Sequence, residues 1–239
     1  MDTVGLNLEA WKSSLLKSIP IGGLLARNPT AYKWKATFKC WMLREAVSWR
    51  LQDLLAQSYE LHMKGHGLGA RILLRSGYET LGTLIYLNQL MQSLLKEKID
   101  FFSFDRKVSQ LLTGSRDGTT ELESINILTV LQKCDAKYPG LLNIYKMMCE
   151  SAHPNYEGIV AGYSRVDHAE FTTNFENRWM ELYGEHHLDS LDLCMMTFHI
   201  EYNDVWPVLM TDIETWLVEN DEKLERTKPV LEKANPNEE

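Results

Sequence analysis

Residues 70–96 carry apolar side chains around nearly the whole circumference of a helix, which limits what this chain can fold into. The apolar positions are Leu73, Leu74, Tyr78, Leu81, Leu84, Ile85, Leu87, Leu90, Met91, Leu94 and Leu95. Such a helix must be covered by other helices or cross a membrane. The charged Arg75 and Glu79 near its start and the amides of Asn88 and Gln92 favour the first alternative. We therefore expect a buried central helix and no membrane partner.

Helical periodicity recurs along most of the chain and predicts an all-α fold. A long helix is expected over residues 31–62, and three glycines within residues 65–69 separate it from the central helix. Residues 159–175 break the helical period and predict a small β-hairpin lying over the bundle. Further helices are expected over residues 5–18, 103–113, 121–133, 141–152 and 188–216. The chain is thus predicted to be an irregular helical bundle with long antiparallel helices.

Two helices have a face that the pattern predicts to be buried. The helix over 31–62 has an aromatic side, made of Trp34, Phe38, Trp41, Trp49 and Tyr59. The last helix has an apolar seam with alternating spacings of three and four, made of Leu188, Leu191, Met195, Phe198, Tyr202, Val205, Leu209 and Trp216. Pro207 predicts a kink within this seam. The seam suits either the core of one chain or the interface of a homodimer.

Charged residues become dense after about residue 220, which predicts a frayed helix followed by a solvated terminus. We therefore expect one helical domain over residues 1–220 and a charged C-terminal tail over residues 221–239.

The chain begins Met1-Asp2-Thr3 without the basic and apolar segments of a secretory signal, so a cytoplasmic location is expected.

Composition narrows the function classes. The chain has 25 Lys and Arg against 33 Asp and Glu, a net charge of −8, so broad coating of nucleic acid is excluded while a local basic pocket is not. Its four cysteines form no Cys-x-x-Cys pair, which predicts reduced thiols and no zinc ribbon. The glycine run lacks the phosphate-loop pattern, and neither Gly-x-Ser-x-Gly nor His-Glu-x-x-His occurs. We expect no cofactor and no metal.

Arg71, Arg75 and Glu79 form the first constellation that needs a chemical explanation. They are spaced four residues apart, so they drift only about 80° around the helix axis and share one side. Because that helix is expected to be covered, a guanidinium and a carboxylate there must be paired. The pair is either a structural ion pair or the centre of a polar site.

Glu150-Ser151-Ala152-His153-Pro154 is the second constellation. Pro154 ends the helix, so His153 lies where the helix becomes a loop, with Glu150 three residues earlier to orient its imidazole. The ring either caps the last carbonyls or points into the mouth of the bundle. Glu-x-x-His is also one arm of a di-iron motif, but no second copy occurs, so a metal site is not expected. His187 is expected at a solvated corner. His199 borders the apolar seam and is expected either to be a hydrogen-bonded core histidine or to face Arg75 or Glu79 across the bundle.

Residues 75–81, Arg-Ser-Gly-Tyr-Glu-Thr-Leu, together with the later Ser-x-His-Pro of residues 151–154, resemble a group of bacterial helical proteins. These carry an Arg/Glu helix and a helix ending in His-Pro, and they distantly resemble the HEPN superfamily of nucleotide-binding and RNA-cleaving domains found in toxins and phage-defence systems. The resemblance covers about residues 40–160. It implies a helical fold and an RNA or nucleotide partner. HEPN ribonucleases place an Arg four to six residues before the catalytic His, and here residues 147–149 are Met-Met-Cys.

Two functions follow from these constellations. In the first, the protein is a helical-bundle binding or interaction protein, and Arg75, Glu79 and His153 form a buried polar site without turnover. In the second, it is a HEPN-like, metal-independent ribonuclease or nucleotide-binding protein. His153 would then act as general base, Arg75 would hold the phosphate, and Glu79 or Glu150 would orient them.

Overall fold

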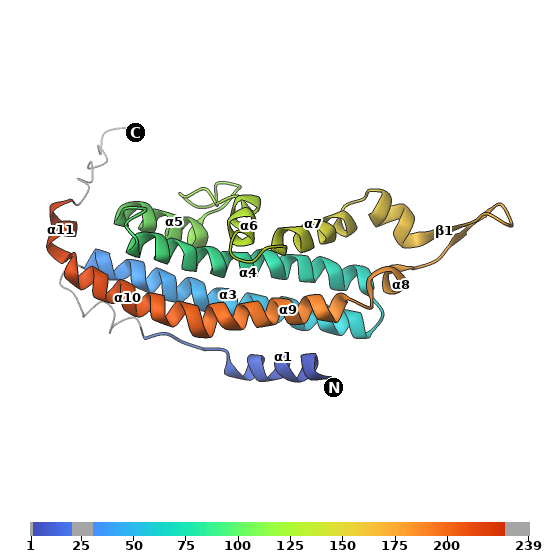
Figure 1. Ribbon diagram of the computed structural model, residues 1–239, viewed down its shortest axis with the longest axis horizontal. Coiled ribbons are helices and arrows are strands. Elements are labelled where there is room, and N and C mark those ends of the chain that lie inside the picture. Colours follow the sequence, from blue (N-terminus) through green and yellow to red (C-terminus); the bar gives the residue numbers. More distant parts are fainter. Residues whose placement is uncertain (1, 21–30, 228–239) are drawn as a thin grey trace.

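A computed structural model describes residues 2–20 and 31–227 of the protein. The central element is α4 (Gly67–Leu95), which in Figure 1 runs between α3 (Ala31–Met63) on one side and the shorter helices α5, α6 and α7 on the other. Buried side chains point from α4 in every direction, including Leu74, Leu81 and Leu87. The prediction of an all-α bundle around a buried central helix is confirmed. In the described residues, no helix is long and apolar enough to cross a bilayer.

The other elements pack around this centre. The helices are α1 (Thr3–Ser14), α5 (Phe101–Thr113), α6 (Ile127–Asp135), α7 (Leu141–Ala152), α8 (Trp179–Tyr183), α9 (His187–His199), α10 (Trp206–Glu219) and α11 (Asp221–Arg226). Two π-helical segments, η1 (Tyr156–Ala161) and η2 (Ile200–Val205), lie between them. The expected helical start at residue 121 is wrong, because Asn126 caps α6: its side-chain oxygen accepts a hydrogen bond from the backbone N–H of Leu128.

The buried face of α3 differs from the predicted one. Phe38 and Trp41 are half-buried and Trp49 is exposed, while the side chain of Trp34 lies outside the described residues. The buried face consists instead of small and aliphatic side chains, namely Ala36, Cys40, Leu43, Val47, Leu51 and Leu55. These let α3 approach α4 closely, because a Cβ added at Gly77 would lie 3.0 Å from a methyl group of Leu55. Close helix packing, rather than aromatic area, therefore selects this face.

The seam of the last helix is interrupted by η2. A π-helical turn holds an extra residue, so every later side chain rotates by about one position. Burial accordingly moves from the predicted Val205 and Trp216 to Trp206 and Leu217, while the predicted Leu209 remains buried. Pro207 lies in the first turn of α10, and its missing N–H and crowded ring disfavour a regular α-turn directly before it. The seam residues Leu191 and Leu209 are part of the core of this chain.

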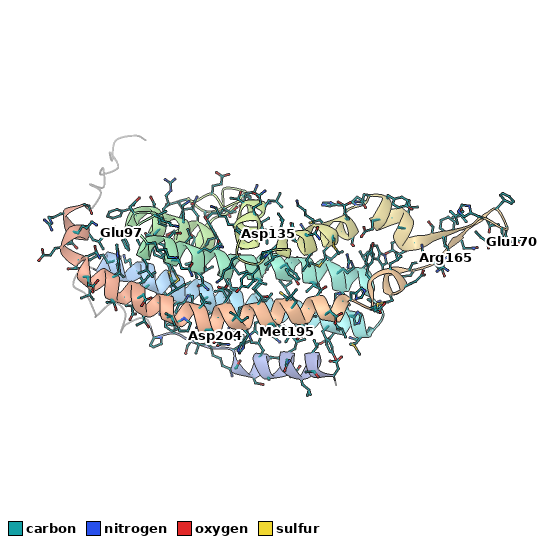
Figure 2. The ribbon with its side chains drawn as sticks, in the orientation of Figure 1. Glu97, Asp135, Arg165, Glu170, Met195 and Asp204 are labelled. Atoms are coloured by element: carbon teal, nitrogen blue, oxygen red, sulfur yellow. The ribbon has the colours of Figure 1, made fainter. Side chains whose placement is uncertain are left out.

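The predicted β-hairpin is confirmed as β1 (Ser164–Asp167) paired antiparallel with β2 (Thr172–Phe175), with Val166 opposite Thr173. It does not lie over the bundle, as expected, but projects beyond its end, with Glu170 near the tip (Figure 2). Its base is anchored by Trp179, which is fully buried and packs against Gly162 so closely that a Cβ there would lie 2.5 Å from the indole.

Packing continues past the boundary expected at residue 220. α11 buries Leu224 in the core, and the fully buried Lys33 of α3 pairs with Asp221 and, at 3.3 Å, with Glu225. A helix is present where a frayed one was expected, but α11 packs on the bundle, because ion pairs with Lys33 and the buried Leu224 hold it there. The rest of the predicted tail, residues 228–239, lies outside the described residues.

Candidate functional site

The structure brings Arg75 and Glu79 together. Arg75 Nη2 lies 3.1 Å from Glu79 Oε1, and both side chains keep 24% of their surface exposed. The Tyr145 hydroxyl of α7 accepts a hydrogen bond from Arg75 Nη2 at 3.0 Å and donates to Glu79 Oε1 at 2.9 Å. Arg75 Nε also donates to Cys149 Sγ at 3.1 Å. These four side chains form a closed network that ties α7 to α4.

The surroundings of this network determine the protonation states of Arg75 and Tyr145. Burial disfavours the charged form of Arg75, but the hydrogen bond to Cys149 and the charge of Glu79 outweigh it, so the pKa of Arg75 is raised. Burial, with the hydrogen bonds to Cys149 and Glu79, raises the pKa of Tyr145 far above its usual value. The guanidinium is therefore permanently charged and engaged by its neighbours, which suits a structural tie between helices.

Arg71, one turn before, is buried and belongs to a second polar cluster. Its Nε donates to Ser151 Oγ at 2.9 Å, and its guanidinium lies 3.9 Å from the ring centroid of Tyr183. Ser151 in turn donates to Glu157 Oε1 at 2.6 Å. Burial lowers the pKa of Arg71, and the nearby Tyr183 and Glu157 oppose that effect. Burial and Glu157 raise the pKa of Tyr183 to about 12, so its hydroxyl stays protonated at neutral pH.

His153 does not join these clusters. It caps the C-terminal end of α7 in extended geometry (φ −93°, ψ 147°), as expected for a residue before proline, and its side chain is exposed. In residues 2–20 and 31–227, no contact joins its ring to Arg75 or Glu79. Glu150 is also exposed and accepts a hydrogen bond from Asn155 Nδ2 at 2.6 Å instead of orienting the imidazole. The expected Arg/Glu/His site is therefore not assembled.

His187 is buried, contrary to the expected solvated corner, because it stacks on His62 of α3 at 4.9 Å between ring centroids. Its Nε2 lies 3.0 Å from Ser58 Oγ, whose own proton goes to the Ala70 carbonyl oxygen at 2.7 Å. His187 must then donate to Ser58, so it cannot act as a base toward that hydroxyl. Burial, followed by His62 and Arg71, lowers the pKa of His187 to about 4, which keeps the ring neutral.

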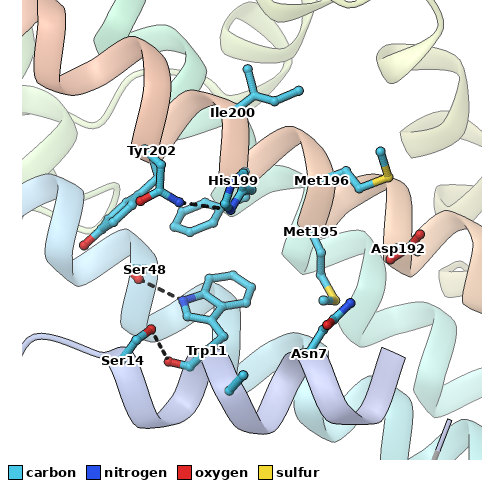
Figure 3. Close-up of a pocket in the computed structure, with 13 residues that line it drawn as sticks. Asn7, Trp11, Ser14, Ser48, Asp192, Met195, Met196, His199, Ile200 and Tyr202 are labelled. Carbon is cyan, nitrogen blue, oxygen red and sulfur yellow. Dashed lines mark hydrogen bonds between the residues drawn. The ribbon is translucent and has the colours of Figure 1, made fainter. Parts of the chain in front are cut away.

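His199 likewise does not face the Arg75–Glu79 pair. Its side chain is exposed and its Nδ1 lies 3.0 Å from Asn203 Nδ2, at the edge of a groove between α1 and α9. This groove, called here the α1–α9 groove, has a volume of about 550 Å³ (Figure 3). Its lining consists of Asn7, Ala10, Trp11, Ser14, Ser48, Asp192, Met195, Met196, Phe198, His199, Ile200, Tyr202 and Asn203. The walls thus combine a mostly apolar surface with a few polar groups.

Aromatic stacking fixes one end of the groove. The Trp11 ring lies 4.5 Å from that of Phe198 at an interplanar angle of 25°, and its Nε1 donates to Ser48 Oγ at 3.2 Å. Tyr202 also stacks on Phe198, at 5.0 Å between ring centroids. Figure 3 shows Trp11 on α1 opposite Met195 and His199 on α9. These contacts give the groove a preformed wall built from three elements.

A buried ion pair lies behind that wall. The Arg44 guanidinium lies 3.4 Å from the Tyr202 ring centroid and 4.4 Å from that of Trp206, and it pairs with Glu45. The Tyr202 hydroxyl donates to Glu45 at 2.8 Å, and burial together with this carboxylate raises the pKa of Tyr202. Cation–π and charged hydrogen bonds of this kind hold the Tyr202 ring in one orientation.

The inner face of η2 is anchored by Glu201. This fully buried carboxylate accepts hydrogen bonds from Asn88 Nδ2 at 2.7 Å and from the Tyr138 hydroxyl at 2.6 Å, and it pairs with Lys137. The π-helical turn, held from inside, presents Tyr202 and Asn203 to the groove. π-Helical turns often mark functional sites, and here one forms part of the lining.

Within the part of the chain that the structure describes, no group of three His, Cys, Asp or Glu side chains is placed to hold a metal ion. Cys40, Cys134 and Cys194 are buried free thiols and Cys149 is half-buried. Comparison of the chain with protein-family models, with curated proteins and with solved structures finds no match.

Proposed function

We propose that the protein is a binding protein and that its α1–α9 groove holds a small amphipathic molecule with a flat apolar body and a polar end. The observation that carries this proposal is the groove itself. Its volume of about 550 Å³ is typical of small-molecule sites, which are mostly apolar with a few polar groups that orient the ligand. Trp11, Met195 and Phe198 would contact the apolar body, and His199 and Asn203 would meet the polar end.

Rigid support favours a ligand site over a surface irregularity. Tyr202 is held by Glu45 and Arg44, and Trp11 is held by Ser48 and Phe198, so little side-chain freedom remains to be lost on binding. Met196 at the mouth is exposed and flexible, a side chain that adapts to varied apolar ligands.

Binding of the dye 8-anilinonaphthalene-1-sulfonate, a flat aromatic anion, tests this proposal. We expect a saturable rise in dye fluorescence with wild-type protein and at least ten-fold weaker binding by Met196→Glu, because the added carboxylate repels the sulfonate and obstructs the mouth. Met63→Glu is the matched control, since both methionines are 58% exposed and Met63 does not line the groove. Absence of saturable binding, or equal loss in both variants, would contradict the proposal.

The ribonuclease alternative remains a prediction, and the contacts around Arg75 do not favour it. Glu79, Tyr145 and Cys149 already engage the guanidinium that would hold a phosphate, and the exposed His153 does not contact it. A general base must come within hydrogen-bond reach of the proton it takes, together with the group that stabilises the charge. The described arrangement provides no such pair.

A homodimer also remains a prediction. The seam that suggested it is buried within one chain, so a second copy would need another surface. The hairpin offers one, because Phe171 and Phe175 are 94% and 83% exposed and a two-stranded hairpin gains little stability alone. Light scattering over a range of concentrations tests this. A dimer that Phe175→Ser converts to monomer would support it, and a wild-type monomer at all concentrations would contradict it.

A further inference from the structure

A second cavity, unlike the first in charge, lies where α4 ends. It has a volume of about 490 Å³ and is enclosed by the last turns of α4, the connection to α5, and parts of α5 and α6. Its lining consists of Tyr86, Gln89, Leu90, Gln92, Ser93, Lys96, Lys98, Ile99, Lys107, Lys133 and Ala136. Four of these side chains are lysines and none is acidic. We call this cavity the lysine pocket.

This concentration of positive charge is unexpected for the chain as a whole. Acidic residues outnumber Lys and Arg by 33 to 25, yet four lysines and no acidic side chain line this cavity. Like charges brought together in a concave surface repel one another and attract an anion. Glu97 is an acidic residue directly between Lys96 and Lys98 in the sequence, at the end of α4 (Figure 2), but it does not line the pocket.

Among residues 2–20 and 31–227, the four ammonium groups have no carboxylate partner. In the described residues, none of them forms an ion pair or a side-chain hydrogen bond, whereas Lys39 and Lys137 each pair with a carboxylate. Their charge is therefore available to a ligand.

Helix dipoles account for some of these lysines but not for the set. Lys96 and Lys133 lie near the C-terminal ends of α4 and α6, where a cation is favourable. Lys107 lies in the middle of α5 and is half-buried, so no helix end explains its position. The feature shared by all four is the pocket.

Buried side chains and hydrogen bonds hold the backbone around the lysine pocket in place. Tyr86 and Leu90 of α4 are buried beneath it. Gln89 Nε2 donates to the Lys133 carbonyl oxygen at 2.9 Å, which ties α4 to the end of α6. The backbone N–H of Lys98 donates to the Ser93 carbonyl oxygen at 2.8 Å and closes the turn after α4. The lysines thus extend from backbone that the fold holds in place.

We propose that the lysine pocket binds a compact anion that carries three or more phosphate groups. Lysine recognises phosphate as a point charge without fixed geometry, which suits several ammonium groups around one condensed phosphate chain. No exposed aromatic ring lines the pocket, so it offers no stacking platform for the bases of a nucleic acid strand. This site is independent of the α1–α9 groove and of the function proposed for it.

Calorimetric titration of the full chain with inorganic tripolyphosphate tests the proposal. We expect saturable binding that weakens as salt concentration rises, and at least ten-fold weaker binding of inorganic phosphate. The double variant Lys107→Met/Lys133→Met should bind tripolyphosphate at least ten-fold more weakly than wild type. Removing two mutually repelling charges should leave the fold intact, and the melting temperature of each protein checks this. The single variant Lys133→Met, at an exposed position, gives a second measurement.

The double variant Lys12→Met/Lys146→Met is the matched control, because it removes the same charge from exposed lysines outside the pocket. It should bind tripolyphosphate like wild type. The proposal is overturned if wild-type protein does not bind tripolyphosphate, or if both double variants lose affinity equally. It is also overturned if a single-stranded RNA oligonucleotide binds the pocket more tightly than tripolyphosphate does, since the ligand would then be a nucleic acid.

Discussion

Replacement of Glu201 by leucine is expected to lower the free energy of unfolding by about 1–3 kcal/mol, the cost of leaving a buried hydrogen-bond donor without its acceptor. Glu201 is fully buried and accepts hydrogen bonds from Asn88 and Tyr138 as well as pairing with Lys137. Leucine would leave the Tyr138 hydroxyl and the Lys137 ammonium without their acceptor. Denaturation in urea measures this loss.

Glu219→Leu is the control for this prediction. Glu219 is exposed near the end of α10, so its replacement should change the free energy of unfolding by no more than about 0.5 kcal/mol. A loss below about 1 kcal/mol for Glu201→Leu would show that the carboxylate does not anchor η2. Because η2 carries Tyr202 and Asn203, the same variant should also weaken dye binding in the α1–α9 groove.

The second large effect concerns acid stability. The pKa of His187 is lowered from 6.5 to about 4 in the folded protein, so between these values the unfolded chain binds a proton that the folded chain does not. Above pH 6.5 this difference does not affect the free energy of unfolding. As the pH falls from 6.5 toward 4, proton uptake by the unfolded chain lowers the free energy of unfolding. A shift of this size corresponds to about 3 kcal/mol. The groups that face the ring are His62, Arg71 and Ser58.

His187→Phe measures this contribution, because phenylalanine keeps the stacking surface and takes up no proton. Other groups also titrate, so the relevant quantity is the difference between wild type and variant in stability lost from pH 7 to pH 4. We expect wild type to lose about 3 kcal/mol more. His186→Phe changes an exposed neighbour and should lose as much stability as wild type. Equal acid losses for wild type and His187→Phe would disprove the buried, neutral assignment.

Local sequence patterns predicted those features that depend on neighbours along one helix. The apolar circumference of residues 70–96 predicted the central helix, and the four-residue spacing of Arg75 and Glu79 predicted their pairing on one side. The partners from α7, Tyr145 and Cys149, lie about 70 residues away and are set by how α7 packs on α4. No local pattern marks such contacts.

Where the predictions of burial were wrong, the cause was either packing against a distant helix or an irregular turn. His187 follows a charged, polar stretch, but stacking on His62 from α3 buries it. The seam of the last helix was predicted at a constant helical period, and the extra residue of η2 moved burial from Val205 and Trp216 to Trp206 and Leu217. The α1–α9 groove depends on α1 docking beside a helix almost 190 residues later, which no spacing in the sequence encodes.

Methyl NMR spectra of the methionines locate the dye most directly. The chain has 10 methionines, of which Met195 and Met196 line the α1–α9 groove while Met63 and Met147 are exposed elsewhere. Titration with 8-anilinonaphthalene-1-sulfonate should shift the methyl signals of Met195 and Met196 with one common saturation curve and leave those of Met63 and Met147 unchanged. Saturable shifts at Met63 or Met147 without shifts at Met195 and Met196 would contradict the assignment of the groove as the binding site.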